Sequence, residues 1–157
     1  MKKKFTHLDE KGSPLMVDVG EKNPTSRTAE AECVVEIGKE VAELIRCGGT
    51  KKGNPLWMAE VAGVMAAKKT PELIPLCHPI LIEQAVVNCK LEDTLVRIKS
   101  VVKSTGKTGV EMEALTAVAV AGLTLIDMCK SVNRGISIKN IRLLKKTGGK
   151  SGTYIAG

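Results

Sequence analysis

Hydrophobic and polar residues alternate with a period of two in the first strongly patterned part of the chain, from Thr28 to Ile37. Such alternation is typical of a half-buried β-strand. We therefore expect a strand over 28–37, with one face in the core and its glutamates on the other. The inward members would be Ala29, Ala31, Cys33, Val35 and Ile37, and the outward acidic members Glu30, Glu32 and Glu36.

Two segments with helical spacing follow. A short helix is predicted after Gly38, ending at Gly48-Gly49. A second helix should begin at Asn54-Pro55, because Asn suits the N-cap and Pro suits the first helical position. The apolar face of this second helix is expected to hold Trp57, Met58, Val61, Val64 and Met65.

A long helix is predicted from about Val110 to Val132. Its middle, Ala114 to Ile126, is apolar nearly all round, which is typical of a helix covered on every side. Because a small sheet covers only one helix face, we expect the other face, with Val118 and Leu123, to meet a second subunit.

Three further strands and a loop complete the expected order. The strands should cover roughly Ile80–Leu91, Thr94–Ser104 and Ile136–Leu144, and three prolines at 71, 75 and 79 predict an extended loop before them. With the two early helices taken as one crossover layer, the order of elements gives the split β-α-β pattern of ferredoxin-like folds. We predict a single α+β domain over 1–157, with an antiparallel sheet of about four strands and helices on one face. Residues 1–15 would form a loose arm, and 147–157 a Gly/Lys-rich active-site tail.

Charge is distributed unevenly along the 157 residues. The chain has 24 basic and 17 acidic residues, a net charge of +7, and no acidic residue follows Asp127. The seven basic residues beyond it equal the whole excess. A basic C-terminal segment suggests an anionic partner, although a solvated basic tail is an equally simple explanation.

The five cysteines and the apolar runs indicate the compartment. No CxxC pair is present, so the sequence indicates neither a disulfide framework nor a structural zinc site. This cysteine pattern is consistent with a protein of the reducing cytosol. The polar residues after Phe5 do not fit a signal peptide. The apolar run 114–126 is too short to span a bilayer. We expect a cytoplasmic protein without a membrane partner.

The long helix carries candidate chemistry at both ends. Asp127 and Lys130 share a face and could form an acid–base pair, although a surface ion pair has the same spacing. Glu113 and Asp127 are roughly 21 Å apart along the helix axis, so one helix cannot bring both to one reacting atom. Antiparallel packing of two copies could do so. His78, in a proline-fenced loop, is either a site residue or a structural histidine.

Three loops combine glycine with lysine, at 49–53, 105–109 and 147–152. Glycine allows backbone N–H groups to approach an anion closely, and lysine adds positive charge. None of the three is a Walker A loop, because Gly106-Lys107-Thr108 lacks the glycine that the motif requires five residues earlier. Together they favour a nucleotide or polyphosphate ligand.

Several long motifs, in order along the chain, resemble those of the MoaC family of cyclic pyranopterin monophosphate synthases. They are Met16-Val17-Asp18-Val19, Leu73–Pro79 (LIPLCHP), Thr105–Val118 (TGKTGVEMEALTAV), Asp127-Met128-Cys129-Lys130 and Gly148–Gly152 (GGKSG). The resemblance implies a lyase of molybdenum cofactor biosynthesis that converts (8S)-3′,8-cyclo-7,8-dihydroguanosine 5′-triphosphate to cyclic pyranopterin monophosphate and diphosphate. It also implies a homohexamer, a trimer of dimers with active sites at the dimer interface, and no redox cofactor.

The same resemblance implies roles for individual residues. Asp127 and Lys130 match the catalytic pair, with His78 and Lys52 beside them. No ligand motif indicates a metal, although a divalent ion could accompany the phosphates. The substrate-binding set implied by the motifs is Leu76, Cys77, His78, Met112, Glu113, Arg27, Glu111, Lys146 and Lys150.

Two other classes of protein compete with this interpretation. The sequence pI of about 9.2 would suit a small nucleic-acid-binding module. Only three aromatic residues, Phe5, Trp57 and Tyr154, are available for base stacking, which weighs against that module. A simple interaction scaffold would not require three Gly-Lys loops.

Overall fold

The computed structural model describes residues 8–9, 11–48 and 53–157. Five strands form one sheet in the order β2-β3-β1-β4-β5, and all neighbours are antiparallel. The strands are β1 (Thr25–Glu36), β2 (Gln84–Glu92), β3 (Leu95–Gly106), β4 (Ser137–Thr147) and β5 (Tyr154–Ile155). The helices are α1 (Gly38–Arg46), α2 (Pro55–Lys68), α3 (Thr70–Leu73) and α4 (Glu111–Cys129).

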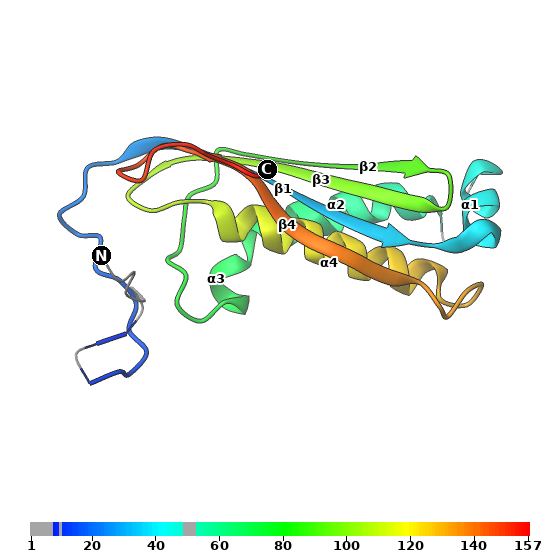
Figure 1. Ribbon diagram of the computed structural model, residues 1–157, viewed down its shortest axis with the longest axis horizontal. Coiled ribbons are helices and arrows are strands. Elements are labelled where there is room, and N and C mark those ends of the chain that lie inside the picture. The colour runs from blue at the N-terminus through cyan, green and yellow to red at the C-terminus, as the bar shows by residue number, and fades with distance from the viewer. Residues whose placement is uncertain (1–7, 10, 49–52) are drawn as a thin grey trace.

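The architecture confirms the α+β, ferredoxin-like prediction. Figure 1 shows α2 and α4 side by side on one face of the sheet, and no helix of the described residues lies over the other face. The short β5, which pairs with the end of β4, is a fifth strand beyond the four expected. The predicted extended loop also differs, because 70–73 form one helical turn before the chain becomes extended. Pro71 suits the first turn of a helix as well as a loop.

The alternation in β1 is confirmed on its inner face. Ala29, Ala31, Cys33 and Val35 are all fully buried against the helices. Gly122 of α4 lies over this face, where an added Cβ would approach the Cys33 sulfur to 3.1 Å. Small side chains on both elements therefore allow α4 to lie close to the sheet.

Helix α2 begins as predicted but buries a different face. The Asn54 side chain accepts hydrogen bonds from the N–H groups of Leu56 (2.9 Å) and Trp57 (3.4 Å), so it is the N-cap. The predicted apolar face is wrong: its members other than Val64 are exposed, Trp57 to 69%. The buried residues are instead Pro55, Ala59, Gly63, Ala66 and Ala67.

The reason is how closely α2 packs against its neighbours. A Cβ on Gly63 would lie 2.9 Å from the Ala117 carbonyl oxygen of α4 and 3.0 Å from Val87 of β2. Only small residues fit this contact, so the large apolar side chains face outward. Because α2 covers the second face of α4, Val118 is fully buried within the chain, and the expectation that it meets another subunit is wrong. Leu123 is exposed.

Helix α4 as a whole, Glu111–Cys129, is long and apolar enough to cross a membrane by length and composition, although its continuous apolar run at 114–126 is shorter. Half of its most apolar window is buried inside the protein. Because α4 packs on the sheet and on α2, this composition is that of a core helix.

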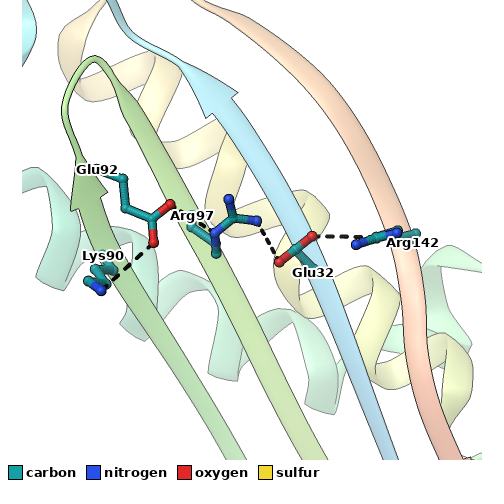
Figure 2. A network of polar contacts seen from close by, with 5 residues as sticks. All are labelled: Glu32, Lys90, Glu92, Arg97 and Arg142. Carbon is teal, nitrogen blue, oxygen red and sulfur yellow. Dashed lines mark hydrogen bonds and ion pairs between the residues drawn. The ribbon is translucent and has the colours of Figure 1, made fainter. Parts of the chain in front are cut away.

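The open face of the sheet carries an ion-pair network that crosses four strands (Figure 2). Arg97 of β3 contacts Glu32 of β1 at 2.8 Å and Glu92 of β2 at 2.9 Å, and Arg142 of β4 lies 3.4 Å from Glu32. Burial alone would raise the pKa of Glu32, but the Arg97 hydrogen bond and the surrounding cations hold that pKa below its ordinary value of 4.5. The network therefore favours the charged carboxylate at the centre of the open face.

Candidate active site

A cavity of about 400 Å³ lies between the α3–β2 loop and the first turn of α4. Its volume is in the range of small-molecule sites. The cavity brings together six of the residues expected to bind substrate. They are Leu76, Cys77 and His78 from the loop, and Glu111, Met112 and Glu113 from α4.

Strand β3 positions both sides of this cavity. The buried Ser100 hydroxyl donates to the Ala114 carbonyl oxygen at 2.8 Å, which fixes the first turn of α4. The buried Ser104 hydroxyl donates to the Leu81 carbonyl oxygen at 2.8 Å, which fixes the loop that carries His78. Two inward positions of one strand, separated by the inward Val102, thereby set the spacing between the two walls.

Glu113 is the buried acid of the cavity. Its side chain is only 2% exposed, and within the described part of the chain its Oε1 atom has no hydrogen-bond partner. Burial raises its pKa, a hydrogen bond with its own backbone N–H lowers it, and the nearby charge of Glu111 raises it, which together bring the pKa to about 7. Glu113 can therefore donate or accept a hydrogen bond near neutral pH.

The raised pKa of Glu113 predicts a pH-dependent stability. Between about pH 4.5 and pH 7 the folded chain holds a proton that the unfolded chain has lost, so its free energy of unfolding falls as pH rises. We expect the free energy of unfolding of Glu113→Gln to lack this fall, and at pH 8 to exceed that of the wild type by about 3 kcal/mol. The measurement is urea unfolding at pH 4.5 and pH 8, at one protein concentration. The exposed Glu43→Gln variant should follow the wild type, and parallel pH profiles for Glu113→Gln and wild type would contradict the assignment.

Cys77 lies beside His78 but is not activated as a nucleophile. Burial raises the pKa of its thiol, and the charge of Glu113 raises it further. A nucleophilic cysteine requires the thiolate, which these surroundings disfavour. Cys77 therefore contributes shape and a weakly polar surface to the cavity.

A second cavity, of about 720 Å³, adjoins the first and is lined by four cationic side chains. They are Lys22, Arg27, Lys107 and Lys150. The two cavities share wall residues, including Glu111 and Gly109, so they form one continuous site. Grouped lysine and arginine side chains with glycine-rich backbone are suited to phosphate groups.

Arg27 links the two Gly-Lys loops that line this cavity. Its Nε donates to the Gly106 carbonyl oxygen at 2.9 Å. Gly149 has a φ of +72°, and a Cβ there would lie 2.3 Å from the Arg27 guanidinium. Only glycine fits this left-handed position against the arginine. Lys146 joins the same wall by donating a hydrogen bond to the Ser151 hydroxyl.

Lys22 is a cationic lining residue that the sequence analysis missed, and Lys107 was noticed only as part of a loop. Lys22 lies three residues beyond the Met16–Val19 motif, and it lines both cavities. Lys22 belongs to no run of basic residues, so the charge pattern of the sequence did not single it out. The motif immediately before it was the one available signal, because Val17 and Val19 also line the first cavity.

Asp127 and Lys130 lie at the opposite end of α4. They form the expected pair, with 2.7 Å between Lys130 Nζ and Asp127 Oδ1. The Lys130 side chain is 60% exposed and the Asp127 side chain 64%. Neither lines the cavities described above. The structure therefore separates this pair from Glu113 within one chain, as the helix length requires. Lys52, the remaining expected catalytic residue, lies outside the described residues.

The basic C-terminal segment is largely paired within the protein. Lys139, Arg142 and Lys145 of β4 contact glutamates of β1, and Lys130 contacts Asp127. This pairing weakens the case for a nucleic-acid module, because a salt-dependent phosphate interface requires free cations. Within residues 8–9, 11–48 and 53–157, no three His, Cys, Asp or Glu side chains are grouped to hold a metal ion.

Comparison with known proteins adds to the geometry. The sequence profile of the MoaC family matches residues 16–149. A protein of Parvibaculum lavamentivorans named cyclic pyranopterin monophosphate synthase is 54% identical over 156 residues, which cover 98% of each chain. Proteins of the same name from Methylobacterium nodulans and Peptoclostridium acidaminophilum are 54% and 51% identical, over at least 96% of each chain. Both the profile and these full-length relatives show that the chain belongs to the MoaC family.

Proposed function

We propose that this protein is a lyase of molybdenum cofactor biosynthesis that converts (8S)-3′,8-cyclo-7,8-dihydroguanosine 5′-triphosphate to cyclic pyranopterin monophosphate and diphosphate. The observation that carries the proposal is the continuous pair of cavities. One contains a buried acid with a pKa of about 7, and the other is lined by four cationic side chains. The relatives that carry the name of this activity match the chain along nearly its whole length.

The two cavities suit the two ends of this substrate. The purine and its fused ribose would occupy the first cavity, where Glu113 can hydrogen-bond to the polar edge of the base and His78 faces the sugar. The triphosphate, with about four negative charges, would occupy the second cavity, where Lys22, Arg27 and Lys150 can neutralise it. The negatively charged end of the substrate would thus lie in the cationic cavity, and its uncharged base and sugar in the cavity of Glu113.

The reaction requires proton transfers and the departure of diphosphate. Opening the cyclised purine and forming the pyranopterin move protons between nitrogen and oxygen atoms, which is general acid–base chemistry. A hydroxyl oxygen of the substrate then gives its proton to a general base and bonds to the α-phosphorus. The bond between the α-phosphorus and the oxygen that bridges to the β-phosphate breaks, and diphosphate leaves with that oxygen and the electron pair. The surrounding cations stabilise the charge that develops on the leaving group.

We assign Lys130 as the general acid, with Asp127 as the residue that holds it. Their ion pair at 2.7 Å supports this assignment, because the carboxylate fixes the ammonium position. Lys52 is proposed as a further catalytic lysine. No redox cofactor is required, because neither the rearrangement nor the release of diphosphate changes the overall oxidation state of the substrate. A divalent ion bound with the phosphates is compatible with this chemistry.

The distance between Glu113 and Asp127 supports a site shared between two chains. We propose a homohexamer built as a trimer of dimers, in which each chain supplies Asp127 and Lys130 to the cavity of its partner. The exposed apolar side chains of α2, led by Trp57 and Met65, with Leu123 of α4, provide surface for contact with another copy. Sedimentation should give six times the chain mass of 16.7 kDa. We place this assembly in the cytoplasm.

Incubation with the cyclised triphosphate tests the proposed function. The full chain should release one diphosphate for each cyclic pyranopterin monophosphate formed, and GTP itself should release none. Folded protein that releases no diphosphate from authentic substrate would overturn the proposal.

Lys146→Ala should chiefly weaken substrate binding. Lys146 contacts Ser151 on the wall of the cationic cavity, so its charge acts on bound phosphates in the ground state as well as during reaction. We expect KM to rise by about tenfold with a smaller fall in kcat. The matched control is Lys145→Ala, because Lys145 contacts Glu30, whose side chain belongs to the open face of the sheet. Steady-state kinetics of diphosphate release would measure both, and unchanged constants for Lys146→Ala would remove it from the site.

A further inference from the structure

Thr108 lies where all the cavities of the site meet. A third cavity, of about 340 Å³, runs beside the first between the His78 loop and the end of β3. Thr108 lines this cavity, the cavity of Glu113 and the cationic cavity, and it alone among the residues that the structure describes lines all three. The sequence motifs gave it no role of its own.

Three contacts fix the loop on either side of Thr108. Arg27 holds the Gly106 carbonyl oxygen at 2.9 Å, and the Lys107 ammonium donates to the Gly20 carbonyl oxygen at 2.5 Å. On the other side, the Glu111 carboxylate folds over Gly109 so closely that a Cβ there would lie 1.8 Å from Glu111 Oε2. The loop is therefore held in place before any substrate binds, which lowers the entropic cost of a contact made by Thr108.

The Thr108 hydroxyl is available for such a contact. Thr108 is only partly buried, and none of the described residues hydrogen-bonds to its side chain. By contrast, the hydroxyls of Ser100 and Ser104, on the strand just before this loop, are both used within the protein. A fixed hydroxyl without a protein partner at the wall of a polar site is suited to bind a ligand oxygen.

We infer that the Thr108 hydroxyl donates a hydrogen bond to the α-phosphate of the substrate; this inference rests on the proposed function. The α-phosphate is the group that joins the nucleoside to the two outer phosphates. If the nucleoside occupies the Glu113 cavity and the outer phosphates the cationic cavity, the α-phosphate lies at the junction that Thr108 lines. It is also the group at which the cyclic phosphate closes and diphosphate leaves. Thr108 is thereby a substrate contact at a reacting centre.

The first test removes only the hydroxyl. Thr108→Val keeps the shape of the side chain and should lower kcat/KM for diphosphate release by at least about tenfold, because a hydrogen bond to a charged oxygen is lost. Thr108→Ser keeps the hydroxyl and should stay within about threefold of the wild type. Thr94→Val is the matched control: Thr94 is also partly buried and lies in the β2–β3 turn, away from the cavities. Thr108→Ala is a second hydroxyl-free variant, should the valine disturb folding.

The second test locates the contact on the substrate. Sulfur in place of one non-bridging α-phosphate oxygen weakens the acceptor at that position. With one of the two sulfur diastereomers, the cost of Thr108→Val should fall below about threefold, because the interaction is already lost. An equal cost with both diastereomers, wild-type activity of Thr108→Val, or an equal loss in Thr108→Ser would each overturn the inference. Failure of the wild-type protein to release diphosphate would instead overturn the proposed function.

Discussion

Lys130→Ala should abolish turnover while leaving the fold intact. Lys130 is 60% exposed and pairs only at the surface with Asp127, and exposed ion pairs contribute little to stability. Loss of a general acid and of a phosphate-facing charge should lower kcat by at least about a hundredfold. Diphosphate release measures the activity, and thermal unfolding checks the fold.

The chain offers a matched control for this experiment. Lys69 forms the same kind of pair with Glu72, three residues further on, at 3.2 Å and with 58% exposure. Lys69→Ala therefore removes an equivalent surface ion pair from another helix end and should leave activity unchanged. Near-normal kcat in Lys130→Ala would show that the pair at the end of α4 is only a surface ion pair, the alternative that its spacing also allowed.

Glu113→Gln and Asp127→Asn, each inactive alone, should partly restore activity when the two proteins assemble together. Glu113 lines the substrate cavity, whereas Asp127 is exposed at the far end of α4, roughly 21 Å further along the helix. An isologous two-fold contact lets each chain donate Asp127 to the cavity of the other. A mixed dimer would then hold one intact site and one doubly damaged site.

Random mixing sets the expected size of the recovery. Half of the dimers would be mixed, so about a quarter of the wild-type number of sites would be intact if the two-fold contact operates alone. The measurement is diphosphate release from co-refolded variants, with subunit exchange confirmed by mass spectrometry. A pair of variants at one location, Asp127→Asn with Lys130→Ala, is the control and should recover nothing, because the mixed site lacks one of the two residues in every arrangement. If verified mixed assemblies of Glu113→Gln and Asp127→Asn recover no activity, the prediction is wrong. Either both residues then act in the site of one chain, or one of them has no catalytic role.

Local sequence patterns were sufficient for the order of elements and for part of the site. The alternation in β1 predicted its buried face residue by residue, and Asn54 predicted the start of α2, because both depend on neighbours within the same segment. The motifs also predicted that Leu76–His78 and Met112-Glu113 belong together, and one cavity holds both. Composition alone did not provide that pairing, which came from the family resemblance.

Other features depend on distances between segments far apart in the chain. The buried face of α2 is chosen by its close approach to α4 and β2 at Gly63, which favours small residues over the larger apolar ones that hydrophobicity selects. For the same reason Val118 is covered within the chain and is unavailable to a second subunit. Hydrophobic periodicity measures only the tendency to be buried and carries no information on available space.

Electrostatics likewise required the tertiary structure. The sequence identified the excess positive charge after Asp127, but only the pairing of β4 with β1 shows that much of it faces glutamates. Glu113 is an ordinary carboxylate in the sequence, and its pKa reaches about 7 because the fold buries it beneath the loop that carries His78. The sequence by itself thus determined most of the elements, the family and most of the candidate residues. The tertiary structure decided which of these residues share a cavity, because desolvation and charge pairing arise only when distant segments meet.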